Sequence, residues 1–391
     1  MLSDNNIINL LGIKDVLISS VKDSSTDIYI EIKTEPKLSV CPCCNHQSKY
    51  VYDYRMQKIK DLPFGNKFIY LLLKKRRYIC YHCGKRFYEK YSFLPRYHRI
   101  TQRVFENIIR LMRENLSMKS IAKMYNISAN TVSRIFDIVQ YRLNKLPRVI
   151  AIDEFKGNSG NEKYQAILTN PEKKKVLDIM PTREKTHLID YFKQFSGREH
   201  VELVVMDMWE PYYDICKWLF PKAKIIIDKY HYIRQVYWAL DRVRKRIQKS
   251  FIAQKRKYFK HSKKLLFAQY DKLDDENKQA VRIMLSQHED LYNAWQLKEL
   301  FTEFRKCSNS KDGRKILRNW ILSAQEINLP EFNDCIKAFC NWSTQILNSL
   351  DYPYTNGFTE GTNNKIKVLK RNAYGYRNFE RFRNRILHCC A

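Results

Sequence analysis

Residues 148–157 read RVIAIDEFKG, an apolar run that reaches two adjacent acids, Asp153 and Glu154. Acids are scarce in this chain, which has 71 Lys and Arg residues against 41 Asp and Glu and a formal net charge of +30. A short apolar run of this kind predicts a buried β-strand, with Asp153 at or near its end. The surrounding sequence indicates what carboxylates could do at that position.

The segments that follow alternate between strand and helix patterns. KYQAILTN and KVLDIMPT predict two more strands, joined by the polar turn sequence NPEKK. A helix comes next, then a strand that ends on Asp207, a helix, a strand that ends on Asp228, and a further helix. Three strands followed by alternating helices and strands predict a layered α/β fold. This order resembles the RNase H-like fold.

Asp153 and Asp207 are expected to meet, because the strands that carry them are neighbours in an RNase H-like sheet. Two unpaired carboxylates at one place repel each other, and a divalent cation relieves that repulsion. Magnesium is bound by a few carboxylates together with substrate phosphate. The sequence therefore predicts a magnesium site with a third acid from elsewhere, and the nearby Glu154 and Glu210 are not expected to be ligands.

Residues 235–350 show no further strand alternation and few Gly or Pro residues, which predicts an all-helical segment. Its aromatic side chains, including Trp295, Trp320 and Trp342, are expected mainly in the core. Some of its Tyr, Lys and Arg residues could face DNA, but the sequence does not separate these from the others.

A helix predicted after the sequence TNG, residues 355–357, supplies the candidate for the third acid. Glu360, Asn364, Lys367 and Arg371 recur at helical spacing and form one stripe. An acid followed by an amide and bases on one face fits a metal ligand beside a track for phosphates. The alternative is a plain surface helix, although such helices more often place acids next to bases as pairs.

Two Cys-x-x-Cys pairs lie in the N-terminal third, in CPCC and CYHC. Together they offer four soft ligands for a tetrahedral zinc ion, and strand-like sequence between them is typical of a zinc ribbon. The predicted ligands are Cys41, Cys44, Cys80 and Cys83. Cys43, His46 or His82 could replace one of them. The alternative is a set of unrelated core cysteines, and a disulfide is less favoured in the cytosol.

Residues 100–139 carry apolar residues at helical spacing, with Ser117 and Ser128 as suitable N-caps. The stretch LSMKSIAKMYNISANTVSRIF resembles a helix-turn-helix, whose last helix reads bases with its first turns. The candidate DNA-reading residues on that helix are Ala129, Asn130, Ser133 and Arg134. The alternative is an ordinary three-helix packing unit.

The charge of +30 and a pI near 9.6 point to a polyanionic partner. Nucleic acid is the first expectation, and an anionic membrane surface is the competing one. No apolar run reaches the length of a membrane span, and the N-terminus lacks the pattern of a signal peptide. We therefore expect a cytoplasmic protein.

The motifs together resemble the DDE transposases of bacterial insertion sequences, specifically the ISL-three family. The resemblance covers nearly the whole length and rests on CPCC…CYHC, the helix-turn-helix, AIDEF, VVMDMWEPY, IIIDKYHYIRQV and TNGFTEGTNNKIKVLKRNAYGYRNFERFRNRI. It implies an RNase H-like catalytic core interrupted by an all-α insertion and preceded by a zinc ribbon and a helix-turn-helix domain. The implied domains are 1–98 (zinc-binding), 99–146 (helix-turn-helix), 147–234 (first part of the core), 235–350 (all-helical insertion) and 351–391 (final core helix with the catalytic Glu).

The resemblance also implies an activity. A DNA transposase of this kind binds the terminal inverted repeats of an insertion sequence as double-stranded DNA, and catalyses metal-dependent strand cleavage and strand transfer into target DNA. Asp153, Asp207 and Glu360 match the catalytic acids, which would hold two Mg²⁺ (or Mn²⁺) ions, while the zinc would be structural. Asp228 and His231 match a supporting Asp-x-x-His element.

The resemblance implies further partners and contacts. A homodimer is expected in the DNA complex, in a protein associated with the bacterial nucleoid. The expected contacts to the DNA backbone on the last stretch are Asn364, Lys365, Lys367, Lys370 and Arg371. One alternative is a catalytically inactive DNA-binding regulator derived from a transposase, against which the intact acids argue. A junction-resolving nuclease is the other, and it rarely carries so long an insertion.

Overall fold

The computed structural model describes residues 12–13, 15–260 and 262–390, and their contacts form two compact units that we describe separately. The first unit contains the chain through Gln140 together with residues 368–375 and 384–389. The second contains residues 141–367 and 376–383 together with Cys390. The C-terminal segment therefore contributes to both units.

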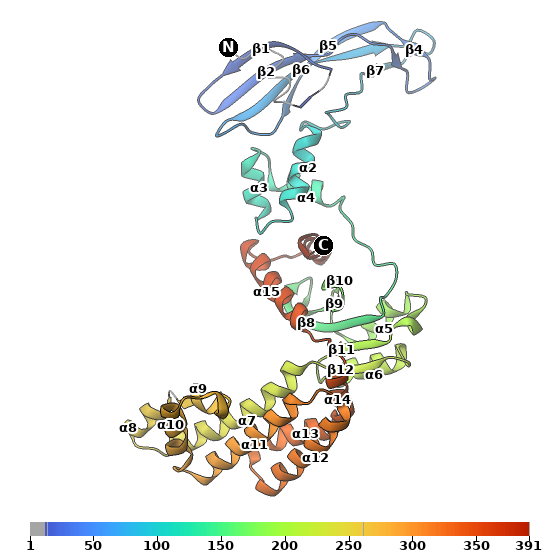
Figure 1. The fold of residues 1–391 in the computed structure, drawn as a ribbon. Helices are drawn as coiled ribbons and strands as arrows, with labels where there is room; N and C mark the ends of the chain where they lie inside the picture. Colours follow the sequence, from blue (N-terminus) through green and yellow to red (C-terminus); the bar gives the residue numbers. More distant parts are fainter. Residues whose placement is uncertain (1–11, 14, 261, 391) are drawn as a thin grey trace. The chain divides into compact units, whose positions relative to one another are not determined.

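A five-stranded sheet opens the first unit (Figure 1). Its strands follow the order β1-β2-β6-β5, and β7 pairs with the far end of β6. Alternate residues face a core that contains Ile30, Ile59 and Leu71. The strands are β1 (Leu17–Asp23), β2 (Asp27–Lys33), β5 (Val51–Lys60), β6 (Phe68–Ile79) and β7 (Arg86–Tyr88), and a separate pair is formed by β3 (Ser39–Val40) and β4 (Gln47–Ser48).

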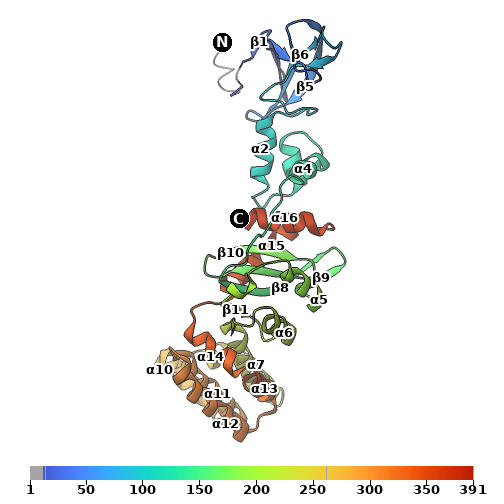
Figure 2. The same ribbon diagram turned by 90° about the vertical axis from the view of Figure 1, so that its right-hand side faces the viewer.

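Three helices follow in the first unit: α2 (Gln102–Leu111), α3 (Met118–Met124) and α4 (Ala129–Phe136) (Figures 1 and 2). Ser117 and Ser128 cap α3 and α4, as predicted, by accepting hydrogen bonds from the backbone N–H groups three residues on. Residues 384–389, at the end of α16 (Phe379–Cys390), complete this helical core. The buried Arg385 donates to the carbonyls of Glu114 and Leu116, beyond the end of α2.

The second unit is built on a sheet with the order β10-β9-β8-β11-β12. The first three strands are antiparallel, while β8, β11 and β12 run parallel. The predicted succession of three strands and then alternating helices and strands is confirmed. The elements are β8 (Val149–Ser159), β9 (Glu162–Asn170), β10 (Lys175–Met180), α5 (Lys185–Lys193), β11 (Leu203–Met206), α6 (Glu210–Leu219), β12 (Lys224–Ile227) and α7 (Lys229–Lys249).

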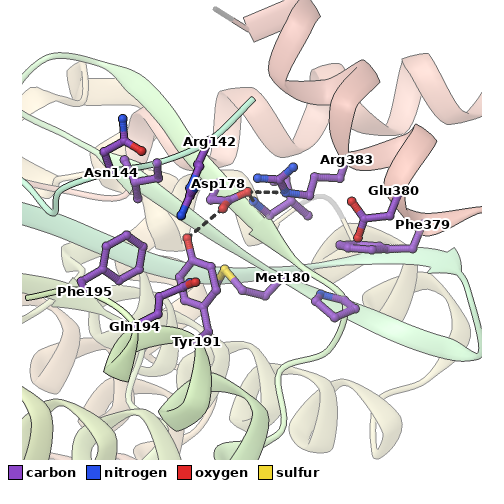
Figure 3. Close-up of a pocket in the computed structure, with 13 residues that line it drawn as sticks. Arg142, Asn144, Asp178, Met180, Tyr191, Gln194, Phe195, Phe379, Glu380 and Arg383 are labelled. Atoms are coloured by element: carbon purple, nitrogen blue, oxygen red, sulfur yellow. Dashed lines mark hydrogen bonds and ion pairs between the residues drawn. The ribbon is translucent and has the colours of Figure 1, made fainter. Parts of the chain in front are cut away.

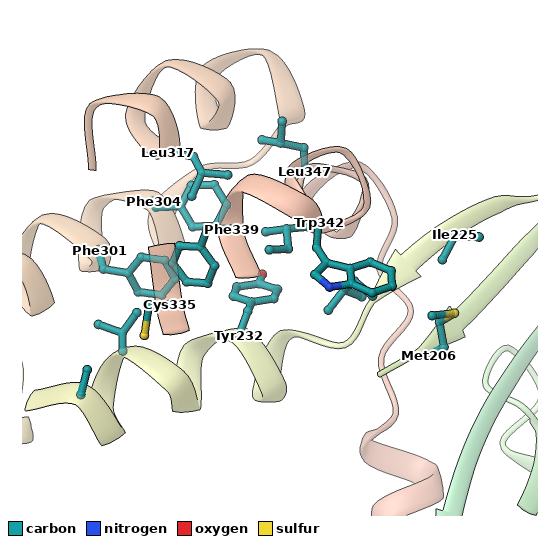
Figure 4. Packing of buried hydrophobic residues seen from close by; sticks show 14 of the residues in the cluster. Met206, Ile225, Tyr232, Phe301, Phe304, Leu317, Cys335, Phe339, Trp342 and Leu347 are labelled. Atoms are coloured by element: carbon teal, nitrogen blue, oxygen red, sulfur yellow. The ribbon is translucent and has the colours of Figure 1, made fainter. Parts of the chain in front are cut away.

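The described residues between α7 and Tyr352 form helices joined by short turns, with no strand among them. Its core is aromatic, as predicted: Trp320 is buried and donates a 2.7 Å hydrogen bond to the Leu297 carbonyl, and Tyr232 packs among Phe301, Phe304 and Phe339 (Figure 4). None of the described helices is long and apolar enough to cross a membrane. The helices are α8 (Ala253–Lys260), α9 (Ser262–Phe267), α10 (Asp275–Leu285), α11 (Glu289–Lys306), α12 (Ser310–Ile327), α13 (Asn333–Asn341) and α14 (Ser343–Asp351), before α15 (Gly357–Asn372).

Candidate active site

Asp153 lies on β8 with a side chain that is almost fully buried. The prediction that it lies at or near the end of the strand is wrong, because β8 continues to Ser159 by pairing with β9. On its other side, the pairing of β8 with β11 stops at Ala151. Asp153 therefore lies two residues beyond the last residue of β8 that pairs with β11.

The Asp153 carboxylate is held by two donors. The backbone N–H of Glu154 donates to Oδ1 at 2.7 Å, and Nδ2 of Asn363 on α15 donates to Oδ2 at 3.0 Å. Burial and the charge of Asp207 raise the pKa of Asp153 to about 7, against an ordinary value of 3.8. The charge of the partly buried Asp207 therefore acts on the buried Asp153.

Asp207 and Asp228 each follow a strand at the same edge of the sheet. Met206 and Ile227 are paired in the parallel register of β11 and β12, and each aspartate comes one residue later. The ring Nε2 of His231, in the first turn of α7, lies 2.9 Å from Asp207 Oδ1. Although burial opposes it, the Asp207 carboxylate raises the pKa of His231, so that an imidazolium is favoured between these acids.

Glu360 enters from the first turn of α15. Asp228, His231 and Glu360 each offer a ligand atom, and these three atoms lie within 4.8 Å of one another. Asn356 ties the helix to the sheet edge, because its N–H donates to Asp228 Oδ1 at 2.9 Å and its carbonyl accepts from the Glu360 N–H at 2.8 Å. Burial and the neighbouring charge of Asp228 raise the pKa of Glu360.

The chain thus brings the predicted catalytic and supporting residues to one edge of the sheet. The ligand atoms that lie within 4.8 Å of one another belong to Glu360 and to the two residues predicted as supporting, Asp228 and His231. Asp207 contacts His231, and the charge of Asp207 raises the pKa of Asp153. The donor set is rich in carboxylate oxygen, and the buried Asp228 Oδ2 has no hydrogen-bond partner among the described residues. Such a cluster of mutually repelling acids fits a divalent cation.

A recess of about 200 Å³ lies beside these acids. Asp207 and His231 form one side of it, and Trp209, Arg234 and Trp238 form much of the rest. The Arg234 guanidinium lies 4.4 Å from the centre of the Trp238 ring. Glu154 also borders the recess, where it pairs with Arg183 at 2.7 Å and accepts a hydrogen bond from the Tyr212 hydroxyl.

The four predicted zinc ligands converge in the first unit. Their sulfur atoms lie within 4.8 Å of one another, with 3.6 Å between Cys41 and Cys83 and 3.5 Å between Cys44 and Cys80. A tetrahedral zinc ion with Zn–S bonds of about 2.3 Å separates its sulfur ligands by roughly 3.8 Å. The two knuckles share one turn geometry, with positive φ at Asn45 and Gly84 after the second cysteine of each pair. The thiols therefore fit a structural zinc ion.

The alternative zinc ligands fit less well. Cys43 is exposed, and its backbone N–H donates to the sulfur of Cys41. His46 and His82 lie near Cys44, but their rings are stacked with centroids 3.6 Å apart and planes 14° apart. Nδ1 of His46 also lies 3.2 Å from the Cys44 carbonyl. The geometry favours the four cysteines.

Comparisons with known proteins identify the family of the chain. A family model described as a transposase, of the DDE type and the ISL3 group, matches residues 150–386, which is more than half of the chain. The chain belongs to the ISL3 family of transposases. A model for the zinc finger of transposases IS204/IS1001/IS1096/IS1165 matches residues 37–83, and a model for the helix-turn-helix domain of transposase family ISL3 matches residues 89–137 of this transposase.

Individual relatives include the transposase for insertion sequence element IS1001 of Bordetella parapertussis, which is 26% identical over 92% of this transposase and 91% of its own length. The transposase for insertion sequence element IS1557 of Mycobacterium tuberculosis is 32% identical over 22% of this chain and 19% of its own. A Lactococcus lactis protein named an ATP-dependent protease is 46% identical over 67 residues, or 17% of this chain and 22% of its own. So short a match carries no argument about activity.

On α4, the last helix of the helix-turn-helix, only some of the residues predicted to read DNA are accessible. Asn130 and Arg134 are exposed and Ala129 is partly exposed, whereas Ser133 is buried in the helical core. The prediction that Ser133 contacts DNA is therefore not supported, because Ser133 shares the inward face of α4 with Val132 and Phe136. On α15 the predicted backbone contacts are accessible: Asn364, Lys365, Lys367 and Arg371 are exposed and Lys370 is partly exposed.

A pocket of about 380 Å³ in the second unit is lined by none of the catalytic candidates (Figure 3). Asp178 on β10 lies in it, nearly buried. Its carboxylate accepts hydrogen bonds from Arg383 at 2.6 Å and from the Tyr191 hydroxyl at 2.8 Å. This acid is neutralised by a neighbouring cation, so the pocket has the character of a structural junction between β10, α5 and α16.

Sequence reasoning missed several residues of the site. Asn363 and Asn356 bind the aspartates directly, and Arg234 with Trp238 borders the recess. The asparagines are visible in the stretch TNGFTEGTNNK. The sequence does not show which side of α15 faces the sheet, and only the structure shows that Asn363 is buried and Asn364 is exposed. Tyr230, Arg234 and Trp238 recur at i, i+4 and i+8, a spacing that could have marked one stripe of α7.

Changing Asp153 to asparagine should stabilise the magnesium-free transposase at pH 8. The folded chain holds a proton on Asp153 up to about pH 7, while the unfolded chain releases it near 3.8, so the free energy of unfolding falls as pH rises between these values. An asparagine at position 153 has no proton to release. Oδ1 of Asn363 lacks a described partner, so after the Asn363 amide rotates by 180° this oxygen can accept a hydrogen bond from the new side-chain NH₂. The expected gain at pH 8 is on the order of 1–4 kcal/mol.

The measurement is denaturant unfolding of zinc-loaded, magnesium-free protein at pH 8 and pH 4. The gain should shrink to a small fraction of its pH 8 value at pH 4, where the folded chain keeps the proton and the unfolded chain is near the midpoint of releasing it. Added magnesium should stabilise the wild-type chain alone. An equal gain at both pH values would show that packing, and not titration of Asp153, causes the difference.

Proposed function

We propose that this transposase cleaves and joins DNA strands at a single metal-dependent site at the edge of its second sheet. In this proposal the sheet β10-β9-β8-β11-β12 is an RNase H-like core, and the helices between Asp228 and Glu360 are an all-α insertion within it. The domain limits would lie near the predicted residues 98, 146, 234 and 350. The observation that carries the proposal is the convergence of acids from β8, β11, β12 and α15 around His231.

Asp153, Asp207 and Glu360 would hold two magnesium ions, with Asp228 and His231 supporting them. Bound magnesium would supply charge stabilisation at the attacked phosphate and activation of water or of a DNA 3′-hydroxyl. Asn363 and the Glu154 N–H fix the orientation of the Asp153 carboxylate. Asn356 fixes that of Asp228, and His231 offsets part of the negative charge while it contacts Asp207. No side chain of the site needs to act as a nucleophile.

The other parts would grip the substrate. The helix-turn-helix and the zinc ribbon would bind the terminal inverted repeats, and the exposed bases of α15 would contact the DNA backbone near the acids. Cutting two element ends in step favours a homodimer in the DNA complex. A protein with this activity would act on the nucleoid, in the bacterial cytoplasm.

The experiment that tests the proposal is magnesium-dependent nicking of linear DNA that carries the repeats flanking the gene. Cleavage at the repeat ends, with none on the same DNA lacking them, is the expected result. A regulator without catalysis would bind these ends and leave them intact. A junction-resolving nuclease would cut branched DNA whether or not the repeats are present.

Changing Arg134 to alanine should weaken binding to the repeats much more than binding to unrelated DNA. Arg134 is exposed on the recognition helix, and an Arg that reads a base is worth roughly 1–3 kcal/mol of discrimination. Ser133 to alanine, on the buried face of the same helix, is the control and should leave the preference unchanged. Competition binding of repeat DNA against unrelated DNA measures both. Loss of preference in the Ser133 variant alone would contradict the placement of the reading surface.

A further inference from the structure

One open face of the first sheet carries aromatic rings and cations together. On β6 and β7 the pairs Arg77 with Tyr88 and Ile79 with Arg86 lie opposite each other, so these side chains share a face. Lys75 lies two residues before Arg77 on the same face. Tyr52 joins them from β5, at the register shift between Val51 and Asp53. We call Tyr52, Lys75, Arg77, Arg86 and Tyr88 the tyrosine–arginine face.

The opposite face of the same strands is closed. Arg76 and Tyr78, which alternate with the residues of the tyrosine–arginine face, are buried. Arg76 pairs there with Glu89 at 2.8 Å and donates to the carbonyls of Thr34 and Glu35. Tyr78 donates to the Lys37 carbonyl. The chain thus covers one side of this part of the sheet and leaves Tyr52 and Tyr88, at 42% and 40% exposure, on the other.

The rings hold the cations in place. The guanidinium of Arg86 lies 4.0 Å from the centre of the Tyr52 ring, and the ammonium of Lys75 lies 4.7 Å from that of Tyr88. Arg77 lies between the two rings and is fixed by two hydrogen bonds to Asp53. A guanidinium stacked on a ring is restricted in rotation while its N–H groups remain at the edge, available to an oxygen ligand.

The chemistry of this face selects an anionic partner. Arg55, exposed and opposite Lys75 in the register, adds a further cation, while Asp53 offsets only Arg77. Each ring already has a cation within 4.7 Å of its centre, so an unpaired base that stacked there would have to share the ring with that cation. Prearranged cations on an open sheet match phosphate oxygens, which carry the charge of duplex DNA.

We propose that the tyrosine–arginine face binds the phosphate backbone of duplex DNA, with Arg86 as a contact and Tyr52 as the residue that positions it. The inference rests on the proposed function for the choice of partner. In this proposal the two parts of the first unit have different roles. The recognition helix reads the DNA sequence, and the zinc-ribbon sheet adds affinity that does not depend on sequence. The face lies beside the zinc knuckles, since β6 and β7 flank Cys80 and Cys83.

The test measures how the affinity for DNA depends on salt, by fluorescence anisotropy with full-length, zinc-loaded protein. Changing Arg86 to alanine should weaken binding to repeat DNA and to unrelated duplex by the same factor, and should reduce the slope of log affinity against log salt by about 1. Changing Tyr52 to alanine should shift both DNAs in the same direction, while Tyr52 to phenylalanine, which keeps the ring, should not. The Y52A/R86A double variant should bind no more weakly than R86A.

The matched control is Lys22 to alanine, which removes one exposed charge from β1 of the same sheet. If Lys22 to alanine equals Arg86 to alanine in its effect, only net charge matters and the proposal is wrong. A loss confined to repeat DNA would assign Arg86 to base reading and would also overturn it. So would a greater loss for single-stranded DNA in Y52A than in R86A, because that result indicates stacking on bases. Each outcome concerns binding alone, so it is independent of whether the acids cleave DNA.

Discussion

Changing Asp207 to alanine should abolish magnesium-dependent cleavage of repeat ends while DNA binding remains. Asp207 lies at the end of β11, in contact with His231 and close enough to Asp153 to raise its pKa. In the proposed site Asp207 holds a metal ion, and removing such a ligand loses several kcal/mol of transition-state stabilisation, which corresponds to a fall in rate of roughly 10³-fold or more. The recognition helix and the zinc ribbon belong to the other unit of the chain, so affinity for the repeats should stay within about twofold.

Glu210 to alanine is the matched control for this prediction. Glu210 is an exposed acid only three residues further along, at the start of α6, and no described contact joins it to the cluster. The Glu210 variant should cleave repeat ends at the wild-type rate. The variant with Glu360 changed to glutamine should lose cleavage as the Asp207 variant does. If the Asp207 variant still cleaves while the Glu210 variant does not, the ligands are assigned to the wrong acids. Unchanged unfolding midpoints in all three variants would exclude loss of the fold as the cause.

Much of the catalytic unit could be predicted because its signals are local. Buried parallel strands are continuous apolar runs, and each acid that follows such a run must lie at the same sheet edge. This reasoning placed Asp207 and Asp228 correctly. It misplaced Asp153 within its strand, because the end of β8 is set by its antiparallel partner β9 and not by its own sequence. The register with β11, which ends at Ala151, still leaves Asp153 at the edge.

The rest depended on contacts between segments far apart in the sequence. Asn363 and Asn364 are adjacent and chemically identical, yet only Asn363 reaches Asp153, some 210 residues away in the chain. The burial of Ser133 depends likewise on tertiary packing. Residues 384–389 complete the helix-turn-helix core by contacts such as His388 to the Ile109 carbonyl at 2.8 Å. No local pattern in α16 indicates that partner.

Changing Cys44 to alanine should remove the zinc ion and unfold the zinc ribbon. The ion joins two knuckles that are more than thirty residues apart in the chain, and Cys41, Tyr78, Cys80 and Phe87 form only a small apolar cluster around them. Structural zinc contributes roughly 10–16 kcal/mol of binding free energy that is also folding free energy. Since β6 and β7 flank the second knuckle, we expect the whole end of the sheet to lose its order, and affinity for repeat DNA to fall by at least tenfold.

Cys43 to alanine supplies a control one residue away. Cys43 is exposed and lies outside the group of four converging sulfurs, so this variant should keep one zinc ion per chain and bind DNA normally. Elemental analysis of purified protein and anisotropy with repeat DNA measure the two variants. Full zinc in the Cys44 variant, or none in the Cys43 variant, would show that Cys43 is the true ligand. Asn45 has the positive φ that Gly84 has in the other knuckle, and this correspondence aligns Cys44, and not Cys43, with Cys83.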